Sequence, residues 1–166
     1  MTPPLILASQ SPRRAQLLSM LGLELARQLG WAFLDADDRH PATNVEKMRA
    51  GVPLTDADRE PWLVAVREWV RQHAGRGDDV VLACSALKRS YREYLSDVDA
   101  GVVTILLNAP TEVLARRLIE RRQHFAGVEL LDSQQRTLEL PDDAIVVDAT
   151  QPVATVVDQI RAQLGI

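Results

Sequence analysis

Five short apolar runs, separated by longer stretches of helical period, constrain the fold of this chain most strongly. The runs are nearly continuous rather than alternating, which is typical of strands buried on both faces of a parallel sheet. They comprise residues 5–8 (LILA), 32–34 (AFL), 80–83 (VVLA), 103–107 (VTILL) and 144–147 (AIVV). Strands that alternate with helices predict a doubly wound α/β fold with a five-stranded parallel sheet. The chain has 166 residues and no linker-like stretch, so we expect one domain over residues 1–166.

Two stretches of the chain carry clear helical patterns. Thr55 is followed three residues later by Asp58, which matches a capping box and predicts a helix start there. Apolar residues then fall on one helix face, at positions Trp62, Leu63, Val66, Trp69 and Val70. The last helix is defined by a similar pattern, at Pro152, Val153, Val156, Val157, Ile160 and Leu164.

Composition narrows the classes of partner. The formal net charge is −4, whereas a general binder of nucleic acid or of an anionic membrane is expected to be basic. No apolar run approaches the 18 residues that span a bilayer. Cys84 is the one cysteine, which indicates a reducing compartment. We therefore expect a cytoplasmic protein that acts on a small molecule.

Polar residues follow the apolar runs, at the edge where parallel α/β sheets bind their ligands. Asp35 and Asp37 stand two apart after the second run. Such a carboxylate pair can hold Mg²⁺ through water and accept a proton from a substrate hydroxyl. A helix cap or a solvated turn is the alternative interpretation of this pair. The composition of the edge predicts an anionic, hydroxylated ligand handled together with a metal or a phosphate.

Two groups of cations come later in the chain. Ser85, Lys88 and Arg92 lie at the predicted start of a helix, where two cations and the helix N-terminus favour an anion. A second group, which predicts a lid that closes over transferring phosphates, consists of Arg117, Arg121, Arg122 and His124. Ordinary solvated surface charge is the alternative for both groups.

These motifs resemble the gluconokinases, small kinases related in fold to shikimate and adenylate kinases. The matching stretches are residues 34–41 (LDADDRHP), 44–48 (NVEKM), 51–59 (GVPLTDADR), 61–63 (PWL), 84–92 (CSALKRSYR), 121–125 (RRQHF), 131–134 (LDSQ) and 147–152 (VDATQP). The resemblance implies a P-loop-kinase-like fold with a short lid. It also implies transfer of the ATP γ-phosphoryl group to the 6-hydroxyl of D-gluconate with Mg²⁺, in the cytoplasm, by a chain that forms a homodimer.

The resemblance also implies roles for individual residues. Asp37 would contact the substrate hydroxyl and act as the base, and Asp35 would hold Mg²⁺ through water. Gluconate or the transferred phosphate would be bound by Arg39, His40, Arg59, Lys88, Arg92 and His124. Arg117 and Arg121 would serve as lid arginines. The nucleotide would be bordered by Asp148, Gln151 and Pro152. Apart from the resemblance, a helix start capped by Ser11, with Arg13 and Arg14 nearby, predicts that the nucleotide phosphates lie there.

One part of the family pattern is absent. A P-loop of the form GxxGxGKS would fall on residues 12–19 by ungapped count, which places Leu18 at the lysine position. The chain contains no Gly-Lys pair, so no other segment can supply this loop. Ser19 falls on the position of the hydroxyl that coordinates Mg²⁺. Without the preceding glycines, we expect this coincidence of position to have no functional meaning.

Residues 5–23 instead resemble the opening of the Maf-type nucleotide pyrophosphatases, whose LASxSPRRxxLL motif binds nucleotide phosphates. The segment LILASQSPRRAQLLSMLGL is again a strand, a loop and a helix, so the architecture of the first strand and helix can persist. Three interpretations stay open. The chain is a gluconokinase impaired by an altered phosphate loop, a catalytically dead fold that binds gluconate, or a Maf-type pyrophosphatase acting on nucleoside triphosphates.

Overall fold

The described strands form one parallel sheet. The computed structural model describes residues 5–9, 14–86, 88–97, 102–108, 139–142 and 144–166. The sheet has the order β2-β3-β1-β4-β5 and every neighbouring pair is parallel. Its strands are β1 (Leu5–Ser9), β2 (Ala32–Asp35), β3 (Val80–Cys84), β4 (Val103–Asn108) and β5 (Ile145–Asp148). Each strand ends one residue beyond a predicted apolar run, so its last residue lies at the edge of the sheet where a ligand is expected.

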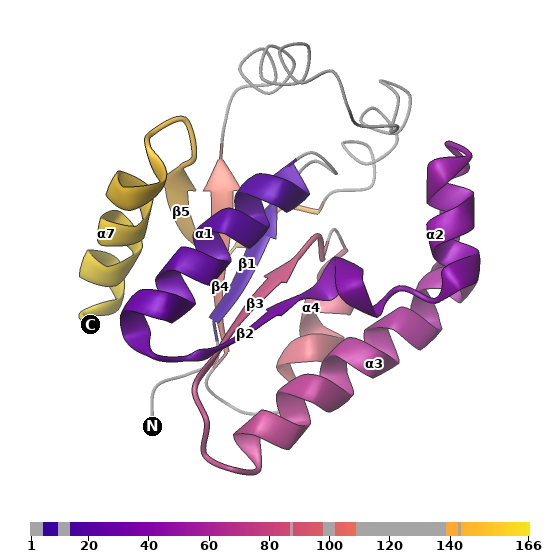
Figure 1. The fold of residues 1–166 in the computed structure, drawn as a ribbon, viewed down its shortest axis with the longest axis horizontal. Coiled ribbons are helices and arrows are strands. Elements are labelled where there is room, and N and C mark those ends of the chain that lie inside the picture. The colour runs from indigo at the N-terminus through magenta and orange to yellow at the C-terminus, as the bar shows by residue number, and fades with distance from the viewer. Residues whose placement is uncertain (1–4, 10–13, 87, 98–101, 109–138, 143) are drawn as a thin grey trace.

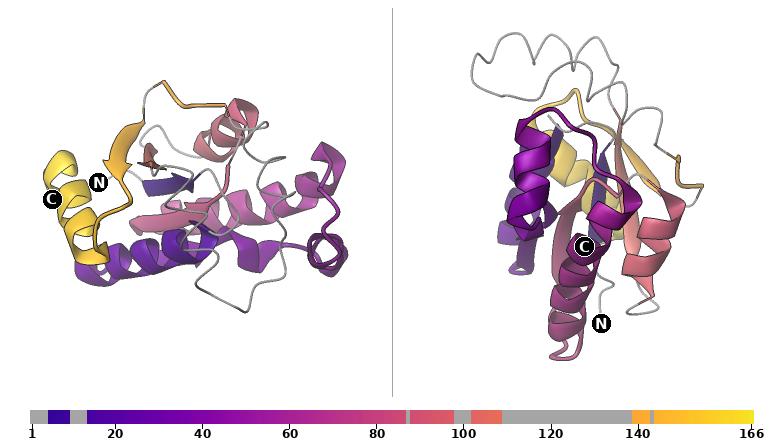
Figure 2. Two further views of the ribbon diagram at one scale, coloured as in Figure 1. Left: turned by 90° about the horizontal axis from the view of Figure 1, so that it is seen from above. Right: turned by 90° about the vertical axis from the view of Figure 1, so that its right-hand side faces the viewer.

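Helices cover both faces of this sheet. In both views of Figure 2, α1 and α4 lie on opposite sides of the strands. The described helices are α1 (Arg14–Leu29), η1 (Ala36–Arg39, a 3₁₀ turn), α2 (Ala42–Arg49), α3 (Asp56–Ala74), α4 (Arg89–Ser96) and α7 (Val153–Leu164). The result is the three-layer arrangement expected of a doubly wound α/β fold.

The pleat of β3 divides the core into two clusters. Val81 and Ala83 pack on one face with α1 and α7, whereas Leu82 and Cys84 pack on the other face with α3 and α4. All five residues of β3 are buried. This explains the unbroken apolar run in the sequence, because both faces of a central parallel strand need apolar side chains.

Helix α3 begins as the capping box predicts. Thr55 Oγ1 accepts a hydrogen bond from the Asp58 backbone N–H at 3.2 Å, and Asp58 Oδ2 accepts one from the Thr55 N–H at 2.9 Å. The predicted apolar face is confirmed, since Trp62, Leu63, Val66 and Val70 are buried. Helix α2 stands beyond the N-terminal end of α3, away from the sheet (Figure 1).

The predicted lid lies outside the described residues, because residues 109–138 are not among them. Within the part of the chain that the structure describes, no helix is long and apolar enough to cross a membrane.

Candidate active site

Asp35 joins two elements at the carboxyl end of β2. Its Oδ1 accepts a hydrogen bond from the Asp37 backbone N–H at 3.0 Å, so it caps the η1 turn. Its Oδ2 accepts a hydrogen bond from the hydroxyl of Ser19 on α1. The hydroxyl of Ser19 and the carboxylate of Asp35 therefore meet at the edge of the sheet, a contact that the sequence pattern does not predict.

Asp37 has a carboxyl group whose pKa is shifted toward neutral pH. Partial burial, followed by the charges of Asp35 and Asp38, raises its pKa to about 6. Its side chain is 46% exposed and is therefore accessible to a ligand. A carboxylate with this pKa is suited to accept a proton at neutral pH.

His40 follows η1 and is held as a neutral ring. Its side chain is 5% exposed and stacks on Trp62, with ring centroids 4.7 Å apart and an interplanar angle of 9°. Trp62 Nε1 in turn donates a 2.6 Å hydrogen bond to the Ala36 carbonyl. Burial, followed by the charge of Arg59, lowers the pKa of His40 to about 4. His40 Nε2 lies 4.0 Å from Asp37 Oδ1, so the ring adjoins the carboxylate pair.

Asn44 and Lys47 of α2 bind the start of α3. Asn44 is 2% exposed, and its Nδ2 donates to the Asp58 carbonyl at 2.6 Å and lies 3.3 Å from His40 Nδ1. Lys47 Nζ donates to Asp58 Oδ1 at 2.6 Å. These contacts fix α2 to the wall of the site beside His40.

Arg59 and Lys88 approach each other from α3 and from the N-cap of α4. Lys88 Nζ donates to both carboxylate oxygens of Asp56, at 2.7 and 2.6 Å. Arg59 Nη1 lies 3.7 Å from Asp56 Oδ1, and the Tyr91 hydroxyl donates to the same oxygen. The structure thus brings together two of the predicted substrate-binding cations, around a carboxylate that the sequence reasoning did not single out.

Arg92 does not join this group as its spacing from Lys88 suggested. Its side chain is 6% exposed and donates to the Ala86 carbonyl at 3.0 Å, so it supports the turn between β3 and α4. An anion was predicted at the start of α4. The Glu139 carboxylate lies there and accepts a hydrogen bond from the Arg89 N–H at 2.6 Å. A carboxylate from another part of the chain therefore already occupies that helix terminus.

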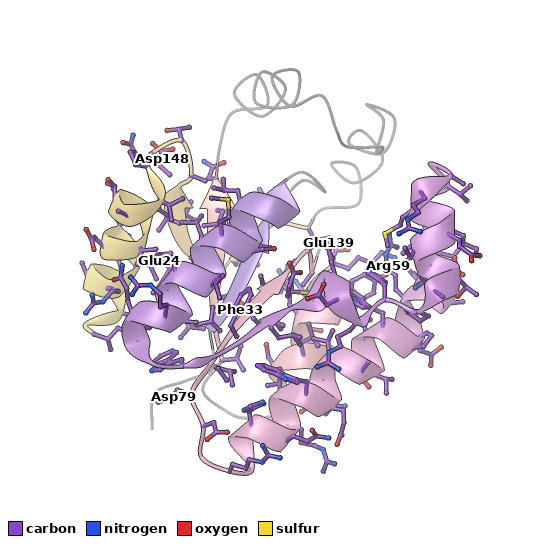
Figure 3. The ribbon with its side chains drawn as sticks, viewed as in Figure 1. Glu24, Phe33, Arg59, Asp79, Glu139 and Asp148 are labelled. Atoms are coloured by element: carbon purple, nitrogen blue, oxygen red, sulfur yellow. The ribbon has the colours of Figure 1, made fainter. Side chains whose placement is uncertain are left out.

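The opposite end of the edge is formed by the turn after β5. Asp148 Oδ1 accepts from the Thr150 N–H at 2.9 Å, and Gln151 Nε2 lies 3.4 Å from Oδ2. Pro152 is the N-cap of α7. The bonds from Thr150 and Gln151 lower the pKa of Asp148. Figure 3 shows Asp148 and Arg59 on opposite sides of the molecule, with Asp148 beside α7 and Arg59 on α3.

The position of the missing lysine lies inside a helix. Helix α1 begins at Arg14, and Leu18 is 3% exposed in the core cluster beneath it. The backbone N–H groups from the fifth helical residue onward bond to carbonyls within the helix and are not free to cradle a phosphate. Leu18 therefore supplies neither the charge nor the backbone donor of a P-loop lysine.

Several predicted site residues receive no structural placement. Ser11, Arg13, Arg117, Arg121 and His124 lie outside the described residues, and only the backbone of Arg14, the first residue of α1, is described. Arg39 is exposed at the end of η1.

Comparison with known proteins identifies the family. The sequence model of the shikimate kinase family matches residues 19–164. A probable gluconokinase of Xenopus tropicalis is 40% identical over 164 residues, covering 88% of this chain and 86% of that protein. The chain belongs to the gluconokinase family. The gluconokinase of Gluconobacter oxydans is 50% identical over 119 residues, covering 72% of this chain and 67% of that protein. The crystal structure of a gluconokinase from Sinorhizobium meliloti has a TM-score of 0.85 at 35% identity and covers 98% of this chain and 91% of that chain.

Family membership confirms the predicted α/β P-loop kinase fold. The matched region begins at Ser19, the residue that meets Asp35 and the last residue of the absent P-loop by count. The resemblance of residues 5–23 to Maf pyrophosphatases finds no support among these relatives and structures. The replaced segment still forms a strand and a helix, because β1 pairs with β3 and β4 as a central strand of the sheet.

Proposed function

We propose that this chain transfers the γ-phosphoryl group of ATP to the 6-hydroxyl of D-gluconate, at a rate reduced by the loss of its P-loop. The gluconokinase relatives, which match most of the chain, carry the proposal. In this proposal, residues 1–166 form one kinase domain. A cytoplasmic location and a homodimer, both implied by the resemblance, stay predictions.

Asp37 is the proposed base. In the reaction, the bond between the 6-oxygen and the γ-phosphorus forms, the bond from that phosphorus to the bridging oxygen breaks, and the hydroxyl proton passes to the Asp37 carboxylate. A pKa of about 6 leaves Asp37 mostly ionised at pH 7 while keeping it basic enough to take part. Arg59, Lys88 and His40 would orient the substrate from the neighbouring wall.

Ser19 and Asp35 are the residues that would hold Mg²⁺. A hydroxyl and a carboxylate suit Mg²⁺, which is usually coordinated by few protein ligands together with substrate phosphates. When bound, the ion would neutralise charge on the transferring phosphate.

We expect the weak step of this function to be the binding of the ATP phosphates. A P-loop binds phosphates through successive backbone N–H groups and a lysine, and α1 offers neither at Leu18. Asp148, Gln151 and Pro152 would still border the base. We therefore expect poor ATP affinity beside an intact acceptor site.

The test is a coupled assay that detects 6-phosphogluconate, run with gluconate and with glucose as the neutral control. We expect slow, gluconate-dependent turnover. Calorimetric binding of gluconate without any turnover would indicate the catalytically dead fold. Release of pyrophosphate from nucleoside triphosphates, with no binding of gluconate, would refute the proposal in favour of the Maf-type activity.

A further inference from the structure

The arrangement around Asp56 is unusual for a surface ion pair. Two donors and one further cation converge on this one carboxylate: Lys88 donates to both oxygens, Tyr91 donates to Oδ1, and Arg59 Nη1 forms an ion pair with Oδ1 at 3.7 Å. We call Asp56, Arg59, Lys88 and Tyr91 the Asp56 cluster. Two full positive charges meet one negative charge in it, so the cluster keeps a net charge of +1.

Exposure within the cluster is uneven. The side chain of Asp56 is 64% exposed, whereas those of Lys88 and Arg59 are 27% and 16% exposed, and Tyr91 is buried. The donors are therefore recessed and the carboxylate lies on their solvent side. An anion arriving from solvent would meet these donors where the Asp56 carboxylate now lies.

His40 lies between the cluster and the proposed base. Arg59 is close enough to His40 for its charge to lower the pKa of that ring. His40 in turn lies 4.0 Å from Asp37. A sugar acid whose terminal hydroxyl faced Asp37 would carry its own carboxylate at the far end of its carbon chain, where it would need cations to pair with.

We propose that Asp56 is an internal counter-anion that occupies the anion site formed by Arg59, Lys88 and Tyr91, and that the carboxylate of the sugar acid replaces it on binding. This inference rests on the proposed function and adds a specificity-determining residue to it. Exchange of one carboxylate for another keeps the ion pairs and hydrogen bonds of the donors. A neutral sugar carries no charge that could replace Asp56 on these donors, so it does not use this site.

Asp56 also has a structural role that must be separated from this one. It lies in the first turn of α3, where a negative charge stabilises the helix, and it ties α3 to α4. Both roles predict that Asp56→Asn lowers the stability of the protein. The counter-anion role alone predicts that the same variant binds anions more tightly.

The experiment compares the wild-type chain with Asp56→Asn and with Glu60→Gln. Glu60 is an exposed acid one turn later on α3, so its variant is matched for charge and helix. Isothermal titration calorimetry measures binding of D-gluconate and of glucose, and thermal denaturation with and without sulfate measures binding of a simple anion. We expect Asp56→Asn to lower the gluconate Kd about fivefold, in line with removal of a partly exposed competing ion pair. Sulfate should raise its Tm more than that of the other two proteins, and glucose binding should not change.

Each outcome has a defined meaning. Equal or weaker binding of both gluconate and sulfate by Asp56→Asn would overturn the proposal, as would the same gain in Glu60→Gln. A stronger effect of sulfate without any binding of gluconate would uphold the counter-anion and refute gluconate as the substrate. If Asp56→Asn does not fold, the same thermal denaturation with and without sulfate is carried out on Lys88→Gln. Loss of the sulfate-dependent rise in Tm supports the anion site, and retention of that rise refutes it.

Discussion

The neutral state of His40 predicts a specific loss of stability in mild acid. The ring is 5% exposed and stacked on Trp62, and burial followed by the charge of Arg59 lowers its pKa from 6.5 to about 4. In the unfolded chain the ring regains an ordinary pKa near 6.5. Between these two values the unfolded chain binds a proton that the folded protein does not. Stability from this group is therefore full above pH 6.5 and falls as the pH drops toward 4.

The size of the effect follows from the gap between the two pKa values. At about 1.4 kcal/mol per pH unit, the full gap corresponds to about 3 kcal/mol, of which about 2 kcal/mol is lost between pH 7 and pH 5. Asp37 acts in the opposite direction, because its raised pKa lets the folded protein bind a proton between about pH 6 and 4. The contribution of His40 must therefore be isolated with a variant.

Urea denaturation of the wild type and of His40→Gln, followed by circular dichroism at pH 7 and pH 5, measures this contribution. The variant also loses the stacking on Trp62, but that loss is the same at both pH values and cancels in the comparison. We expect His40→Gln to be more destabilising at pH 7 than at pH 5 by about 2 kcal/mol. Equal destabilisation at both pH values would show that His40 is not held neutral by its surroundings.

Three further predictions concern the base, a helix cap and the acceptor site. Asp37→Asn should lower turnover by about 10²–10⁴-fold with little change in gluconate affinity; lower affinity with unchanged turnover would make Asp37 a binding residue only. In the wild type, kcat/KM should rise with pH through a midpoint near 6 as this carboxyl ionises. Thr55→Ala should cost about 1 kcal/mol in urea denaturation, because it removes one half of the capping box of α3; no measurable loss would contradict the role of this cap. Lys88→Ala should weaken gluconate binding by about 1.5–3 kcal/mol in calorimetry, whereas equal binding of gluconate and glucose by the wild type would count against a carboxylate site there.

The sequence predicts the strands and one helix start well because these depend on local patterns. Burial on both faces of a parallel sheet leaves an apolar run that can be read directly, as for residues 80–83 in β3. The end of a strand is less visible, since backbone pairing continues into a polar residue such as Asp35. The capping box of Thr55 and Asp58 is equally local, and the structure reproduces both of its hydrogen bonds.

The parts of the site that the sequence does not predict depend on contacts between distant residues. Asp56 looks like an ordinary acid in the first turn of a helix, and its partner Lys88 lies 32 residues away. Arg92 has helical spacing from Lys88, but the turn at Ala86 draws its guanidinium inward. Ser19 did carry a signal, namely its count along the absent P-loop. Its contact with Asp35 became visible only when α1 placed its hydroxyl against that carboxylate.

The central claim is that this chain is a gluconokinase whose activity is reduced because residues 12–19 lack the sequence of a P-loop. The measurement that tests it most directly is the coupled assay at saturating gluconate, on the unmodified chain and on a chain with residues 12–19 replaced by GVSGSGKS. Leu18→Lys alone is the matched control, and it should destabilise the protein without raising activity, because that side chain is buried in the core. We expect the repaired chain to be more active by several orders of magnitude. Full activity of the unmodified chain, or none in the repaired one, would contradict the account.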